Sequence, residues 1–164
     1  MKILDKEQIH RKIQRLTVEI LERNFGEKDI ILVGINRNGL EMATLLAKEF
    51  ESRASVNVQL TQLRINPAKP LEGALFVDLP LESVNNKVVI LIDDVANTGR
   101  TIFYALRPLL DVLPKKVEVA VLVDRKHKSF PIQPDYVGLS LATTLKENID
   151  VQIRDTTDWS VHLN

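Results

Sequence analysis

The stretch Val88-Val-Ile-Leu-Ile-Asp-Asp-Val-Ala-Asn-Thr-Gly-Arg-Thr101 joins five apolar residues to two adjacent aspartates and then to a short polar loop. A continuous apolar run of this length is typical of a strand that is buried on both faces of a parallel sheet. Ligands bind at the carboxyl ends of such strands, where the loops lead into the N-termini of helices. The stretch therefore predicts a binding site at Asp93 and Asp94, where a central strand ends.

The polar loop after the aspartates has the composition of an anion site. The segment Thr98-Gly-Arg-Thr101 falls where the next helix should begin, so free backbone N–H groups, the helix dipole and two hydroxyls would meet there. Any one of these residues could equally be a strand terminator or a helix cap; the combination favours function. The glycine spacing and the lysine of a nucleoside-triphosphate P-loop are absent, and Gly34 to Gly39 does not complete a dinucleotide fingerprint. A ligand with both a phosphate and a vicinal diol, such as a phosphorylated ribose, fits better than ATP or NAD.

The composition describes one domain of ordinary size. The 164 residues are 45% hydrophobic, enough for one core, so we expect a single domain over residues 1–164. Lys plus Arg and Asp plus Glu number 22 each, so no excess charge favours nucleic acid or membrane. The chain has no Cys, its first residues are polar, and no apolar run approaches the roughly 20 residues that span a bilayer. We therefore expect a cytoplasmic protein with no membrane partner.

Strands and helices alternate along most of the chain. Asp5 and Gln8 have the spacing of a capping box, which predicts an amphipathic helix that ends near Asn24 and Gly26. Strands are predicted at 30–35, 56–61, 87–92, 117–123, 136–141 and 149–153, and further helices at 43–50 and at 102–113. Pro108 should kink the second of these helices or leave one of its backbone carbonyls unpaired. Residues 65–83 break the pattern with three prolines and a glycine, as in a long lid-like connection. The alternation favours an α/β fold with a mostly parallel sheet and helices on both faces.

The segment Ile90-Leu-Ile-Asp-Asp-Val-Ala-Asn-Thr-Gly-Arg-Thr101 resembles the phosphoribosyl pyrophosphate (PRPP) signature of the type I phosphoribosyltransferase family. Nearly the whole chain is similar to one branch of that family, the pyrimidine-operon attenuation proteins, which are uracil phosphoribosyltransferase relatives that also bind messenger RNA. The other segments that carry the resemblance are Ile3-Leu-Asp5, Glu22-Arg-Asn24, Ile31-Leu-Val-Gly-Ile35, Ala120-Val-Leu-Val-Asp-Arg-Lys-His127 and Pro131-Ile-Gln-Pro-Asp-Tyr-Val-Gly138. The resemblance implies the type I phosphoribosyltransferase fold: a central mostly parallel sheet flanked by helices, a small hood built from both chain ends, and a flexible flap.

The resemblance also implies roles for residues at matching positions. Asp93 and Asp94 would bind the ribose hydroxyls and hold Mg²⁺, the only cofactor, directly or through water. Arg37 would join them as a catalytic group, and the segment after Leu63 would be the flap. The remaining PRPP-binding residues would be Ala96, Asn97, Thr98, Gly99, Arg100 and Thr101 around the 5′-phosphate, and Asn36, Arg37, Asn38 and Gly39 in a pyrophosphate loop. The base would be bound by Arg125, Tyr136 and Val137, with an aromatic face for stacking.

The implied activity is transfer of phosphoribosyl from PRPP to a nucleobase, with release of pyrophosphate. Asn97 stands where purine enzymes of this type place an acid, which favours a pyrimidine or another base that needs little proton removal. The base expected is uracil, which would give UMP. The pyrophosphate loop and the flap near Arg64 depart from the family pattern. These departures argue against catalytic activity. The alternative is a PRPP- or nucleoside-monophosphate-sensing regulator that binds RNA, with Arg125 to Lys128 as a small basic patch. A homodimer or larger homo-oligomer is expected by analogy alone.

Overall fold

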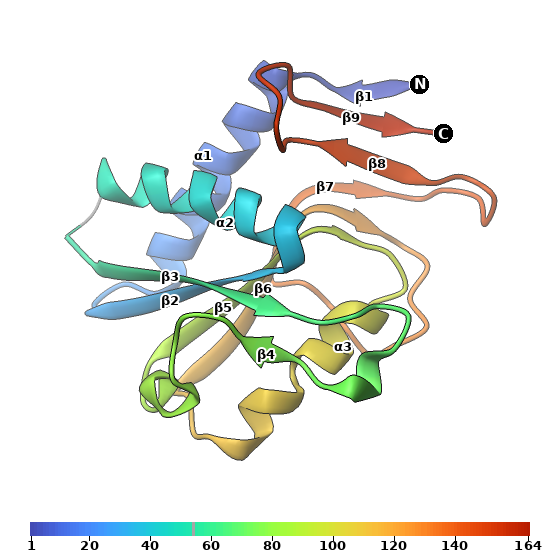
Figure 1. The fold of residues 1–164 in the computed structure, drawn as a ribbon. Helices are drawn as coiled ribbons and strands as arrows, with labels where there is room; N and C mark the ends of the chain where they lie inside the picture. The colour runs from blue at the N-terminus through green and yellow to red at the C-terminus, as the bar shows by residue number, and fades with distance from the viewer. Residues whose placement is uncertain (54) are drawn as a thin grey trace.

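A six-stranded sheet forms the centre of the molecule (Figure 1). The computed structural model describes residues 1–53 and 55–164. All neighbouring strands pair in parallel except β3 and β4, which are antiparallel. In spatial order the strands are β4 (Leu75–Phe76), β3 (Asn57–Arg64), β2 (Asp29–Ile35), β5 (Val88–Ala96), β6 (Lys116–Arg125) and β7 (Tyr136–Leu141). The predicted α/β fold with a mostly parallel sheet is confirmed.

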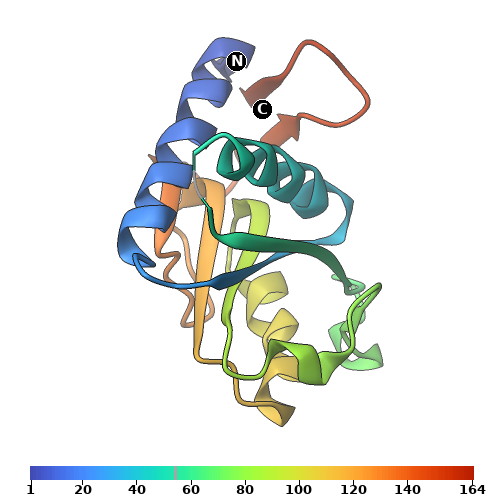
Figure 2. The same ribbon diagram turned by 90° about the vertical axis from the view of Figure 1, so that its left-hand side faces the viewer.

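Helices cover both faces of this sheet, as Figures 1 and 2 show. On one face lie α1 (Lys6–Arg23) and α2 (Asn36–Glu51), and on the other lie α3 (Arg100–Ala105) and the 3₁₀ helix η3 (Arg107–Asp111). Along β5, Ile90 and Ile92 pack with α1 and α2, whereas Val89 and Leu91 pack with α3. Successive side chains of a strand point to opposite faces, so a strand covered on both faces needs an apolar residue at every position.

The first helix begins and ends as its sequence predicts. Asp5 accepts a hydrogen bond from the backbone N–H of Gln8 (2.8 Å), and the side chain of Gln8 accepts one from the backbone N–H of Asp5 (2.9 Å). Asn24 is the C-cap residue. The apolar stripe of this helix, which is buried against the sheet, consists of Ile9, Ile13, Leu16 and Ile20.

The helix after β5 is shorter than the single kinked helix that was predicted over 102–113. The α-helix ends at Ala105, and the 3₁₀ helix η3 follows with Pro108 in its first turn. Proline has no N–H for an α-helical hydrogen bond and its ring clashes with the preceding turn, so it starts a new element here instead of kinking one. Leu113 lies beyond η3 and is 80% exposed, so it is not part of a helical core face.

Both ends of the chain meet in a second sheet above the carboxyl ends of the central strands (Figure 1). This three-stranded antiparallel sheet has the order β1 (Lys2–Leu4), β9 (Ser160–Leu163), β8 (Ile149–Gln152). It is the hood that the family resemblance implied. The connection from β3 to β5, the flap, contains only η1 (Pro70–Glu72), β4 and η2 (Leu81–Val84). Within the described residues, no helix has the length and apolar character required to cross a membrane.

Candidate active site

The two aspartates lie near the carboxyl end of β5, and each carboxylate accepts a hydrogen bond from the backbone N–H of the next residue. Asp93 Oδ1 accepts a hydrogen bond from the N–H of Asp94 (2.9 Å), and Asp94 Oδ1 accepts one from the N–H of Val95 (3.0 Å). Burial, and next to it the charge of Asp94, raise the pKa of the Asp93 carboxyl well above its usual value. The other carboxylate oxygen of Asp94 accepts from Nδ2 of Asn38 (2.9 Å), so the acidic pair is joined to the start of α2.

The four residues expected to form a pyrophosphate loop are the first turn of α2. The helix begins at Asn36 directly after β2, with no separate loop and no side-chain cap, so the loop prediction for residues 36–39 is wrong in its backbone form. A Cβ atom on Gly39 would lie 2.4 Å from the carbonyl oxygen of Ile92, so only glycine lets the helix start this close to β5. The free N–H groups of this turn point past the strand end, where the N-terminus of a helix favours an anion.

One cavity of about 440 Å³ brings together six of the predicted residues, from the start of α2, the acidic pair and the start of α3. Three of its residues were not predicted as site residues, and the first, Ile35, is the last residue of β2. Pro67 comes from the flap, and Arg154 follows β8 in the hood. Because Arg154 lines this cavity, its guanidinium is a second cation there beside Arg37. The side chain is exposed and also pairs with Asp155 (3.3 Å). The full lining is Ile35, Asn36, Arg37, Asn38, Pro67, Asp93, Asp94, Thr101 and Arg154.

A smaller hollow of about 60 Å³ lies inside the loop between β5 and α3, and we call this loop, Ala96 to Thr101, the phosphate loop. Gly99 is the N-cap of α3 with φ +83°, a left-handed conformation that favours glycine. Arg100 donates to the carbonyl of Pro67 (3.0 Å), which ties the flap to this loop. Asp93 and Thr101 line both cavities, so the two cavities are adjacent. The larger one offers carboxylates that can bind a diol, and the smaller one offers backbone amides that can bind a phosphate.

The acidic pair fits a hard divalent cation that is completed by substrate. Within the residues that the structure describes, no three His, Cys, Asp or Glu side chains gather as a ready-made metal site. Mg²⁺ in proteins is usually held by one or two carboxylates together with water and substrate phosphates. Asp93 and Asp94 supply two carboxylates at the wall of a cavity large enough for such a substrate.

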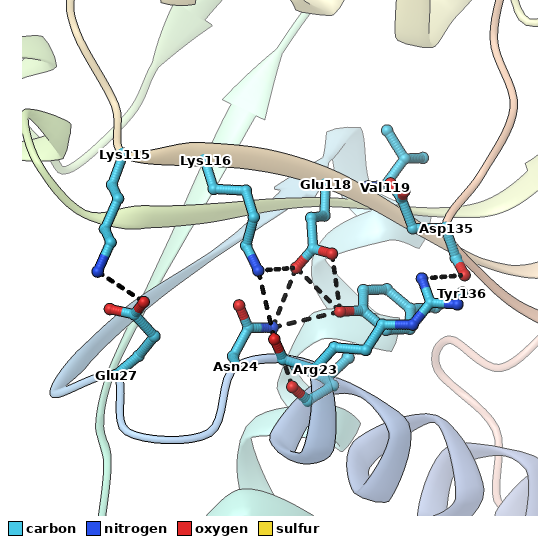
Figure 3. Close-up of polar contacts among 10 residues, drawn as sticks. Arg23, Asn24, Glu27, Lys115, Lys116, Glu118, Val119, Asp135 and Tyr136 are labelled. Atoms are coloured by element: carbon cyan, nitrogen blue, oxygen red, sulfur yellow. Dashed lines mark hydrogen bonds and ion pairs between the residues drawn. The ribbon is translucent and has the colours of Figure 1, made fainter.

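The structure contradicts the predicted role of Tyr136. Its side chain is fully buried under the C-terminal end of α1, so no face is free to stack on a base (Figure 3). Its hydroxyl contacts both carboxylate oxygens of Glu118 (2.9 Å each) and Nδ2 of Asn24 (3.2 Å). The guanidinium of Arg23 lies 5.0 Å from the ring centroid. Burial of the ring and the Glu118 carboxylate raise the pKa of Tyr136, which keeps the hydroxyl protonated as a donor.

The other two predicted base-binding residues, Arg125 and Val137, line neither cavity. Arg125 ends β6, and its guanidinium donates to the hydroxyl of Thr143 and the carbonyl of Thr144. Val137 lies in β7 opposite Val121, with its side chain against the core on the α3 face. A contact of either residue with a base stays a prediction.

Comparison with known proteins identifies the class that this fold and site define. A model of the phosphoribosyl transferase domain matches residues 2–155, and the chain therefore belongs to the phosphoribosyltransferase family. Curated relatives are named bifunctional protein PyrR. One from Limosilactobacillus fermentum is 37% identical over 165 residues, which cover 93% of this chain and 90% of that protein. One from Brevibacillus brevis is 39% identical over 160 residues, covering 93% and 89%.

Solved structures of the same fold come from more distant proteins. A hypoxanthine-guanine phosphoribosyltransferase from Bacillus anthracis gives a TM-score of 0.73 at 17% identity, covering 86% of this chain and 82% of that one. A hypoxanthine phosphoribosyltransferase from Trypanosoma cruzi gives 0.78 at 15% identity, covering 98% and 90%. The expected type I phosphoribosyltransferase fold and the resemblance to the pyrimidine-operon branch are both confirmed.

Proposed function

We propose that this phosphoribosyltransferase transfers the phosphoribosyl group of PRPP to a pyrimidine, uracil, and forms UMP and pyrophosphate. The observation that carries the proposal is the adjacency of the two cavities, which share Asp93 and Thr101. A ligand that spans them would place a vicinal diol at the carboxylates and a phosphate at the phosphate loop. PRPP has both groups, and its pyrophosphate would extend toward the first turn of α2.

The side chains of this site match the charges that develop in the reaction. As pyrophosphate leaves C1 of the ribose, the sugar ring becomes positive, and the carboxylates of Asp93 and Asp94 favour that charge. Arg37, Arg154 and the free N–H groups of α2 would bind the negative leaving group. Bound Mg²⁺, held by Asp93 and Asp94, would supply further stabilisation of the leaving phosphates. No covalent nucleophile is needed, in keeping with a chain that has no Cys.

The choice of a pyrimidine is supported by Asn97. Its Oδ1 is buried and has no hydrogen-bond partner among the residues that the structure describes. An amide oxygen can accept a hydrogen bond from an N–H group, but it cannot take up the proton as a carboxylate would. A base that needs little help in losing a proton is therefore favoured over a purine.

A panel of bases tests the activity. We expect UMP from uracil and PRPP only with Mg²⁺, and little product from orotate, hypoxanthine, guanine, adenine or xanthine. Asp94→Asn should lower kcat/KM by about 100-fold or more, since a charge that stabilises the transition state is lost. The matched control is Asp158→Asn at an exposed position before β9, which should keep wild-type kinetics. Turnover of a purine in preference to uracil would refute the pyrimidine assignment.

A second candidate function, RNA binding by a regulator that senses PRPP or a nucleoside monophosphate, is favoured by the basic face of α1. Leu4, Gln8, Arg11, Lys12 and Arg15 line a surface hollow of about 250 Å³. Of the basic patch predicted at 125–128, Lys126 and Lys128 both pair with Asp124, so that patch is partly neutralised. Three results together would favour this second function: no base in the panel gives a nucleotide, UMP binds, and the affinity for RNA falls as the salt concentration rises.

The proposal includes a homodimer or larger homo-oligomer that acts in the cytoplasm. Its support is the analogy with the family, because the structure contains a single chain. Size-exclusion chromatography with light scattering at micromolar concentration would detect the assembly, and a monomer mass under all conditions would exclude it.

A further inference from the structure

The outer side of the phosphate loop is packed against the connection between β6 and β7, residues 126–135. The backbone N–H groups of Ser129 and Phe130 both donate to the carbonyl of Thr98, at 3.0 and 3.1 Å. A Cβ atom on Gly99 would lie 3.0 Å from Cβ of Ile132, so the two segments are in close contact. The conformation of the phosphate loop therefore depends on this neighbouring segment as well as on β5 and α3.

Lys128 supplies the side-chain part of this contact. Its ammonium donates to Asp124 Oδ1 (2.5 Å), to the carbonyl of Ala96 (3.2 Å) and to the carbonyl of Arg125. An ammonium group has three N–H donors, and here three protein acceptors use them. Lys128 is thus fully occupied within the protein, and its role toward a ligand has to be indirect.

The partner of Lys128 is itself fixed. Asp124 pairs with Ala96 in the register between β6 and β5 and is only 5% exposed. A carboxylate this deeply buried is costly without a cation, so the Asp124–Lys128 pair is held in one place. The lysine in turn holds the carbonyl of Ala96, the first residue of the phosphate loop.

We propose that Lys128 is a positioning residue for the 5′-phosphate site, an inference that rests on the proposed function. By fixing the peptide after Ala96, Lys128 keeps the N–H groups of the phosphate loop aimed at one point before the ligand arrives. Prearranged donors bind a phosphate better than donors that must be ordered on binding. The effect should fall on ligands that carry the 5′-phosphate and should spare the free base.

The chain contains a matched control at Lys126. This lysine also pairs with Asp124, at 3.4 Å from Oδ2, but its side chain is 60% exposed. Within the described part of the chain, its ammonium pairs with Asp124 alone. Lys126→Met therefore removes a cation from the same carboxylate without freeing the phosphate loop.

The test compares Lys128→Met, Lys128→Arg and Lys126→Met by calorimetric titration with Mg²⁺-PRPP and with UMP, and by KM for uracil. We expect Lys128→Met to bind PRPP and UMP about tenfold more weakly, as for loss of a charged hydrogen bond. The KM for uracil should change less than twofold. Lys128→Arg keeps the charge but not the compact three-donor geometry, so it should recover part of the loss. Lys126→Met should match the wild type.

Each outcome separates the inference from the function on which it rests. If the wild type binds neither PRPP nor UMP, the proposed function is wrong. If the wild type binds both and Lys128→Met binds them as Lys126→Met does, the positioning role is wrong. Equal weakening of the phosphate ligands and of uracil would show a general structural effect and would also refute it. Should Lys128→Met fail to fold by circular dichroism, the comparison of Lys128→Arg with Lys126→Met decides.

Discussion

Tyr136 connects the end of α1 to the sheet through a buried carboxylate (Figure 3). Its hydroxyl donates to Glu118, which is only 7% exposed and also accepts from Asn24 (3.0 Å). Tyr136→Phe keeps the packing of the ring and removes one donor from this carboxylate. We expect the free energy of unfolding to fall by about 1–3 kcal/mol, the usual cost of a buried charged acceptor that loses a partner. Urea denaturation followed by circular dichroism measures the change.

Tyr104→Phe is the control for this substitution. Tyr104 is partly buried beside Phe103 and Phe130, and its hydroxyl has no hydrogen-bond partner within the described part of the chain. Its loss should change the unfolding free energy by less than about 0.5 kcal/mol. Equal effects of the two substitutions would show that the contact with Glu118 does not stabilise the fold.

The same tyrosine shows why a residue's role is hard to predict from sequence. An aromatic residue at the start of a strand near a binding site can stack on a ligand or fill the core. What decides between these is the position of Glu118 in β6 and of Asn24 at the end of α1, which contact Tyr136 only after folding. Asp93 and Asp94 were predictable because their position follows from one local pattern, an apolar strand that ends in acids.

The junction of β2 with α2 depends on close contact between backbones. A Cβ atom on Gly39 would lie 2.4 Å from the carbonyl oxygen of Ile92, so Gly39→Ala must push the first turn of α2 away from β5. We expect a loss of about 1–3 kcal/mol in stability, as for overpacked cores, and weaker binding of Mg²⁺-PRPP. Asn38 would move with the turn and lose its contact with Asp94. Thermal unfolding and calorimetric titration measure the two effects.

Gly73→Ala separates this steric effect from backbone strain. Gly73 has φ +102°, and a Cβ atom placed there would have no neighbouring atom within 4 Å, so alanine is strained at this position but meets no neighbour. It should cost about 1 kcal/mol of stability and leave PRPP affinity unchanged. If Gly39→Ala binds PRPP as the wild type does, the first turn of α2 does not contribute to the site.

Elements were predictable where their signals are local. The first five residues of β5 are all apolar because both faces of the strand are covered there, and the Asp5–Gln8 capping box marks the start of α1. The hood strands β1 and β9 were not predicted, because each is three or four residues long and they pair with each other from opposite ends of the chain. The division of the predicted helix at 102–113 into α3 and η3 was also missed, since the effect of Pro108 depends on where the preceding α-helix ends.

At the scale of the molecule, the site is assembled from segments far apart in sequence. The sheet brings Asn38 of α2 to Asp94 of β5, and the hood brings Arg154 to the same cavity. A single cation after a short strand carries no signal that marks it as a site residue, so Arg154 could be found only in the folded chain. The pair of Asp124 and Lys128 was missed for the same reason, because its contact with Ala96 depends on the register of β5 and β6.

The raised pKa of Asp93 makes the site a cost to the stability of the whole domain. Its carboxyl titrates well above the ordinary value of 3.8 when the protein is folded, because burial and Asp94 disfavour the charge. The folded state therefore binds this proton more tightly than the unfolded state does. The free energy of unfolding should decrease as pH rises from about 3.8 through the raised pKa, and the charged form is the least stable.

Asp93→Asn removes this titration while keeping an oxygen for the N–H of Asp94. We expect the variant to be more stable than the wild type at neutral pH, to lack the decrease that Asp93 causes, and to lose phosphoribosyl transfer. Urea denaturation without Mg²⁺ at several pH values between acid and neutral measures the slope. The control is Asp78→Asn in the exposed part of the flap, which should keep the wild-type slope. If the free energy of unfolding depends on pH in the same way for Asp93→Asn and the wild type, Asp93 ionises as easily in the folded protein as in the unfolded chain. Its charge then does not destabilise the fold.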